Sequence, residues 1–154
     1  LEQNAHHCTL CLHCMTVCPT GAITISDKGW PEFQKGLAAA AKAVLSRFDR
    51  TSVLHINVAL NITPICDCWG LSTASFRPDI GIFASGDIVA IDKATIDAID
   101  CAEPIPDTIP KEVTLRPGAG HILQRLWGKD PYLQVREAAR LRMGSLKYKL
   151  KTIS

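Results

Sequence analysis

Four cysteines near the N-terminus have a spacing that suits a metal cluster. The run CTLCLHCMTVCP, residues 8–19, places Cys8, Cys11, Cys14 and Cys18 with two, two and three residues between them and ends on a proline. This is the bacterial ferredoxin pattern for a four-iron, four-sulfur (4Fe-4S) cluster. Three thiolates at the shorter spacing can bind three irons of one cubane, and the fourth iron needs a thiolate from elsewhere. The run therefore predicts an iron–sulfur site with a ligand outside it.

A second pair of cysteines is the source we expect for the remote ligand. Cys66 and Cys68 lie in the stretch NITPICDCWG, where Pro64 and Gly70 indicate a loop. A lone thiol is often a buried structural residue. Two cysteines one residue apart, in a chain that already needs remote ligands, favour the ligand interpretation.

The number of thiols limits the number of clusters. Two all-cysteine clusters have eight iron positions, whereas the chain has seven cysteines. A second cluster would have Cys18, one loop cysteine and at most Cys101, which we otherwise expect to be buried and structural. Either there is one cluster with spare thiols, or a second takes a ligand from Asp67, a histidine or an upstream segment. The predicted cofactor and metal ligands are Cys8, Cys11, Cys14, Cys18, Cys66 and Cys68.

Two other uses of the cysteines fit the spacing less well. Zinc could be bound by Cys8 with Cys11 and Cys14 with Cys18, but zinc modules usually separate their two pairs by about a dozen residues. A secreted disulfide framework does not suit an odd count with four cysteines in one tight cluster. The cysteines therefore indicate a reducing compartment, and we expect the cytoplasm.

Composition excludes several classes of protein. With 154 residues, 47% hydrophobic and 21% charged, the chain is typical of one globular domain with a small appended module. A net charge of +2, with lysines gathered only at residues 147–151, does not predict a nucleic-acid partner. The most apolar run, residues 37–45, is too short for a membrane span. No dinucleotide or P-loop motif is present.

Periodicity predicts an α/β body that must position these cysteines. In residues 52–60 alternate residues from Leu54 to Leu60 are apolar and lie on one side, and His55 and Asn57 lie on the other. Alternating strands and helices favour a small, mostly parallel sheet with crossover helices. The expected elements are helices over residues 32–50, 88–100, 121–127 and 131–143 and strands over residues 52–60 and 79–84, with Asp87 and Asp130 as helix caps.

The predicted organisation has two parts. Residues 1–28 form a ferredoxin-like 4Fe-4S segment, and residues 29–154 form the α/β body, whose 61–70 loop contributes the remote cysteine ligands. Residues 101–120 contain four prolines and are expected to form a long loop.

Four stretches together resemble one family, the uncharacterised iron–sulfur-centre proteins called domain of unknown function 362. They are CTLCLHCMTVCPTGAI, NITPICDCWG, PDIGIFASGDIVAIDKATID and DPYLQVREAARLRMGS. The ferredoxin run occurs in many families, whereas the NITP-x-CDC loop followed by PDIGI and an Asp-x-x-Ala-x-Asp segment, residues 87–92, is much narrower. Family members are usually longer, so the resemblance implies a C-terminal portion or a short member. It also implies iron–sulfur binding and a redox role.

The functional hypothesis is electron transfer by a 4Fe-4S protein, alone or as part of a larger oxidoreductase. It implies a redox protein partner, or a missing N-terminal segment or subunit. One alternative is an enzyme in which an iron with an open coordination position acts on a substrate. Another is a binding module in which the cluster is structural.

Overall fold

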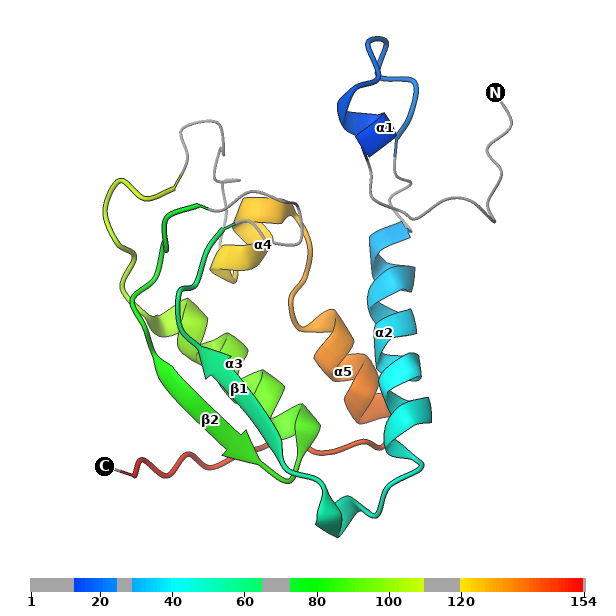
Figure 1. The fold of residues 1–154 in the computed structure, drawn as a ribbon, viewed down its shortest axis with the longest axis vertical. Coiled ribbons are helices and arrows are strands. Elements are labelled where there is room, and N and C mark those ends of the chain that lie inside the picture. The colour runs from blue at the N-terminus through cyan, green and yellow to red at the C-terminus, as the bar shows by residue number, and fades with distance from the viewer. Residues whose placement is uncertain (1–12, 25–28, 65–72, 110–119, 154) are drawn as a thin grey trace.

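The computed structural model describes residues 13–24, 29–64, 73–109 and 120–153 of the chain and is a mixed α/β fold (Figure 1). Among the described residues no helix has both the length and the apolar character of a membrane span. The elements in chain order are α1 (His13–Thr16), α2 (Gly29–Leu45), a 3₁₀ turn (Arg50–Ser52), β1 (His55–Ala59), β2 (Gly81–Ser85), α3 (Ile88–Cys101), α4 (Ile122–Trp127) and α5 (Leu133–Arg140).

The sheet described here is antiparallel, which corrects the expectation of a mostly parallel one. It has two strands, β1 and β2, with Ile56 opposite Ala84 and Val58 opposite Ile82. A parallel pair needs a crossover, usually through a helix. The expected helices instead precede β1 and follow β2, and the chain between the strands turns back on itself. The Phe76 N–H donates to the Ile62 carbonyl at 2.9 Å, across that connection.

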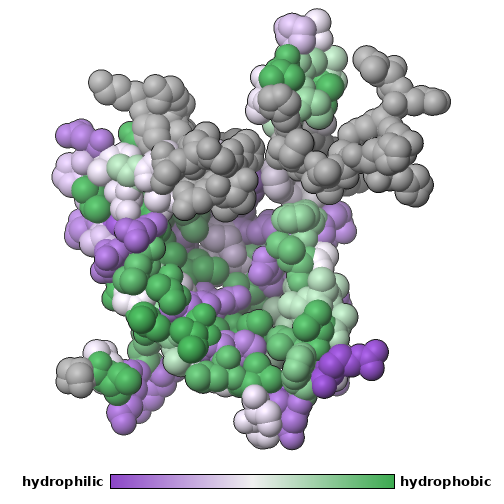
Figure 2. Space-filling model, viewed as in Figure 1, coloured by the Kyte–Doolittle hydropathy of each residue, from purple (hydrophilic) through white to green (hydrophobic). Residues whose placement is uncertain are grey.

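Helix α3 covers the polar face of the sheet. The amide of Asn57, on β1, donates to Asp92 Oδ1 at 3.0 Å and to Thr95 Oγ1 at 3.1 Å, both on α3. The opposite face is apolar and exposed, with Val58 60% and Ile82 68% accessible. Figure 2 shows hydrophobic residues gathered over this region of the molecule. The alternation in β1 is therefore as predicted, but its polar side is the one that packs.

Two groups of buried side chains hold the helices to this sheet. One joins α3 to α5 through Val89, Val135 and Met143, with Leu45 of α2 packed against them. The other surrounds Phe76, which is fully buried, and brings α4 against the connection between the strands. Since α3 borders both groups, it lies between the sheet and the other helices (Figure 1).

Asp87 joins the start of α3 to the chain that follows α5. Its Oδ1 accepts the Ala90 N–H at 2.9 Å, which confirms the predicted helix cap. Its Oδ2 accepts the Ser145 N–H at 2.9 Å. Gly144 lies so close that a Cβ there would stand 1.9 Å from Asp87 Oδ1. The C-terminal segment can therefore follow this path only because residue 144 has no side chain.

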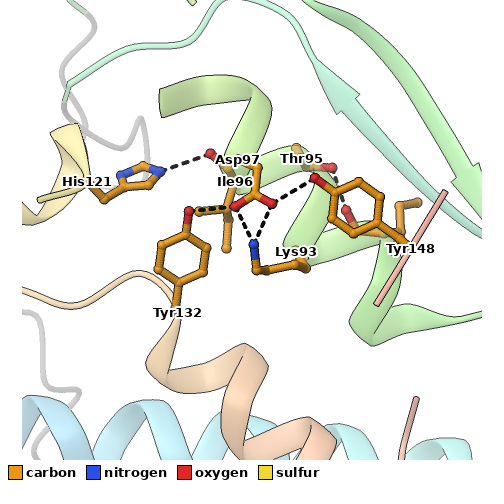
Figure 3. A network of polar contacts seen from close by, with 8 residues as sticks. Lys93, Thr95, Ile96, Asp97, His121, Tyr132 and Tyr148 are labelled. Carbon is orange, nitrogen blue, oxygen red and sulfur yellow. Dashed lines mark hydrogen bonds and ion pairs between the residues drawn. The ribbon is translucent and has the colours of Figure 1, made fainter. Parts of the chain in front are cut away.

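A second polar contact fixes the C-terminal segment further along α3 (Figure 3). Asp97 accepts hydrogen bonds from the hydroxyls of Tyr132 and Tyr148, each at 2.7 Å, and pairs with Lys93 one turn earlier. Partial burial raises the pKa of Asp97, but these three donors together bring that pKa below its usual value. The ionised Asp97 carboxylate therefore attaches two segments to α3. They are the turn before α5, through Tyr132, and the C-terminal segment, through Tyr148.

Most other predicted elements are present with shifted ends. α2 begins three residues earlier than expected and ends at Leu45, five residues early. α3 and α4 match their predicted ranges to within one residue. α5 runs from Leu133 to Arg140, shorter than predicted at both ends. The predicted cap at Asp130 is wrong, since the N-cap is Tyr132, which makes no side-chain cap hydrogen bond. Asp130 instead accepts the Tyr132 N–H at 2.9 Å in the turn before the helix.

The contact between Asp87 and Gly144 predicts the effect of one added methyl group. In Gly144→Ala the Asp87 carboxylate must move and release its two backbone donors, so we expect a loss of about 1–2 kcal/mol in the free energy of unfolding, the usual cost of a lost helix cap. Urea denaturation followed by circular dichroism measures it. The control is Gly36→Ala in α2, where the new Cβ meets nothing within 4 Å and helix propensity favours alanine by about 1 kcal/mol. Equal stability of the two variants would contradict this role of Asp87.

Candidate functional site

Two of the predicted ligands, Cys14 and Cys18, lie in the described part of the cysteine run. Cys14 is exposed on the short helix α1, and Cys18 is half-buried two residues beyond its end. Because a residue that precedes proline is disfavoured in helical conformation, Pro19 accounts for the early end of α1. The Gly21 N–H donates to the Cys18 carbonyl at 3.2 Å, and Gly21 has a φ of 63°. This hydrogen bond closes a tight turn after α1.

The turn gives Cys18 an acidic thiol. Its Sγ lies 3.6 Å from Thr20 Oγ1. The hydrogen bond from Thr20 is the largest cause that lowers the pKa of Cys18 to about 7, and backbone N–H groups of residues 20–23 add to it. A substantial fraction of Cys18 is therefore thiolate at neutral pH. The sequence analysis did not predict a role for Thr20, although a hydroxyl two residues after a cysteine in a turn is a recognisable signal.

These two residues fit the chemistry of a metal–thiolate site. The thiolate is the form of cysteine that binds metals, and soft sulfur ligands suit iron–sulfur clusters and zinc. A lowered pKa reduces the free energy needed to release the proton when a metal binds. Exposure of Cys14 leaves its sulfur accessible from solvent.

The remaining predicted ligands, Cys8, Cys11, Cys66 and Cys68, lie outside the described residues, as do Asp67 and the adjacent histidines at positions 6 and 7. Within the described ranges no three histidine, cysteine or acidic side chains come together in a way that could hold a metal ion. The assembly of the complete ligand set thus stays a prediction.

Cys101 differs from its predicted environment. We expected it to be buried and structural, but it is exposed at the C-terminal end of α3. Ile99 of the same turn packs against the buried group around Phe76, but Cys101 itself is exposed. In Figure 1 α3 ends on the left, whereas α1 lies at the upper right.

The base of the loop that contains Cys66 and Cys68 is anchored on α4. The indole N–H of Trp127 donates to the carbonyl of Pro64, the last described residue before the loop, at 2.7 Å. Pro64 is itself buried. In Figure 1 α4 and α1 both lie toward the upper end of the molecule. The two described segments that lead to cysteines are therefore at the same end of the long axis.

A model of the family described as domain of unknown function (DUF362) matches residues 4–97. The chain belongs to this family. The DUF362 match includes the whole cysteine run, the loop with Cys66 and Cys68, the sheet and most of α3. It ends before Cys101, α4 and α5, so the wider resemblance through residue 145 lies beyond it. Comparison with curated proteins and with solved structures found no match to the chain.

The hydrogen bonds in the turn after α1 predict how the reactivity of the Cys18 thiol depends on pH. In metal-free protein, alkylation of Cys18 by iodoacetamide should be half-maximal near pH 7, because its pKa is lowered to about 7 and the thiolate is the reactive form. Peptide mass spectrometry gives the extent at Cys18 alone.

Thr20→Val removes the hydroxyl and should move this midpoint to higher pH. Thr108→Val is the control, since Thr108 Oγ1 contacts the Ile105 carbonyl in another loop. An unchanged midpoint in Thr20→Val would show that Thr20 does not set the acidity of Cys18.

Proposed function

We propose that this DUF362 protein binds a 4Fe-4S cluster and transfers single electrons, alone or as part of a larger oxidoreductase. The observation that carries the proposal is the cysteine run, with ferredoxin spacing and a terminal proline. Cys18 is not needed for that cluster and would be a spare thiolate or a ligand of a second one. Seven cysteines in the chain favour one complete cluster.

The chain's own residues would have three tasks in such a centre. Cys8, Cys11 and Cys14 would hold it with one cysteine of the 65–72 loop, and it would supply one-electron redox chemistry when bound. Donors near the ligating sulfurs would stabilise negative charge there and so influence the potential. The exposure of the Cys14 region would leave a path for exchange with a partner.

The proposed function also implies a cellular compartment and a partner. Thiolate ligands need reduced cysteines, so we place the protein in a reducing compartment such as the cytoplasm. The electron partner would be a redox protein, or a further segment or subunit associated with this chain.

The test is reduction of anaerobically purified protein by dithionite, followed by electron paramagnetic resonance. We expect a signal that appears on reduction, disappears on reoxidation and returns in a second cycle without loss of iron. Cys14→Ser should remove most of the bound iron and the signal. Cys101→Ser is the matched control, since Cys101 is exposed at the end of α3 and outside the family match. A cluster that loses iron in the first cycle, or equal iron loss in both variants, would contradict electron transfer by this centre.

A further inference from the structure

A cavity at the lower end of the molecule in Figure 1 is lined by positive side chains. It lies where α2 ends and α3 begins, has a volume of about 60 Å³ and is partly open to solvent. Lys42 of α2, Arg50 of the 3₁₀ turn and His55 of β1 line it together with Gly86, which directly follows β2. Three separate segments thus bring one basic side chain each to the same space.

The charge in this cavity is not balanced by the residues that line it. No aspartate or glutamate is among them. Neither Lys42 nor Arg50 forms an ion pair with any residue in the described ranges, although Arg50 donates to the carbonyl of Arg142. Asp49 directly precedes Arg50 but accepts hydrogen bonds from the N–H and the hydroxyl of Thr51, and Asp87, between the lining residues Gly86 and Ile88, accepts the N–H groups of Ala90 and Ser145. Gathering like charges without a counter-ion is unfavourable, and an anionic ligand would relieve it.

We propose that this cavity binds the phosphate group of a small phosphate monoester. Lys42 and Arg50 carry two permanent positive charges, which match the charge of about −1.5 to −2 on a phosphate monoester at neutral pH. A guanidinium fork with an ammonium is a common phosphate-binding combination. A carboxylate carries one charge and would leave one cation unpaired.

The rest of the cavity fits the organic part of such a ligand. Leu45 and Met143 supply apolar wall beside the basic groups. Binding sites for small molecules commonly combine an apolar lining with a few convergent polar groups. Because the enclosed space is small and partly open, the organic part would extend from it toward solvent.

This site is separate from the cysteines and from their proposed function. Residues 29–41 of α2 lie between α1 and the cavity, a length of about 20 Å at the rise of an α-helix. Removing the cluster would therefore leave the cavity residues in place, and loss of one activity would not imply loss of the other.

The test is a titration of the full chain with phenyl phosphate, followed by nuclear magnetic resonance of the backbone amides at constant ionic strength. We expect saturable shifts at His55, Gly86 and Ile88. Lys42→Gln should weaken binding about tenfold or more, because it removes a charge-assisted contact. Lys42→Arg keeps the charge and should bind within about threefold of the unaltered protein.

The matched control is Lys35→Gln, which makes the same charge change on the same helix at a residue paired with Glu32 and outside the cavity. It should change the affinity less than about twofold, since exposed charges at a distance are screened. Equal weakening in Lys35→Gln and Lys42→Gln, or shifts that do not saturate, would overturn the site. Benzoate that binds as tightly as phenyl phosphate would overturn the assignment to phosphate.

Discussion

The position of α3 is the constraint on which the described body depends. One side of this helix packs on the polar face of the sheet through Asn57, and its other side packs on α5 through Val89 and Val135. Its first turn is capped by Asp87, which also holds the C-terminal segment. A two-stranded sheet is marginal by itself, so β1 and β2 need this helix to persist. Pro64, before the segment with Cys66 and Cys68, is in turn bound to α4, and the cavity is lined by residues of these strands and helices.

The two candidate sites lie at opposite ends of the molecule. At the upper end in Figure 1 lie α1, with the exposed Cys14, and α4, which holds Pro64 before the segment with Cys66 and Cys68. At the lower end, Lys42 and Arg50 gather without carboxylates around an open cavity. The acidity of Cys18 comes from hydrogen bonds within its own turn, whereas the basic side chains of the cavity come from separate segments.

Local patterns in the sequence predicted where the helices lie, because capping and the 3.6-residue periodicity of apolar residues depend only on residues a few positions apart. They gave α3 and its cap at Asp87 almost to the residue. The relative direction of the two strands depends on the chain that connects them, which local patterns do not describe. The alternation of apolar and polar residues in a strand also does not reveal which of its two faces packs against a helix. The polar side of β1 packs because Asp92 and Thr95 of α3 satisfy Asn57, a contact between residues 35 and 38 positions apart. The basic cavity was missed for the same reason, since Lys42, Arg50 and Gly86 come from separate segments.

The central claim is that the N-terminal thiolates, with one cysteine of the 65–72 loop, hold iron and inorganic sulfide together. Its most direct test is elemental analysis of protein purified without oxygen, with acid-labile sulfide measured on the same sample. The account predicts a brown protein with about four irons and four sulfides per chain, as for one complete cubane. A colourless protein with one zinc ion and no sulfide would contradict it.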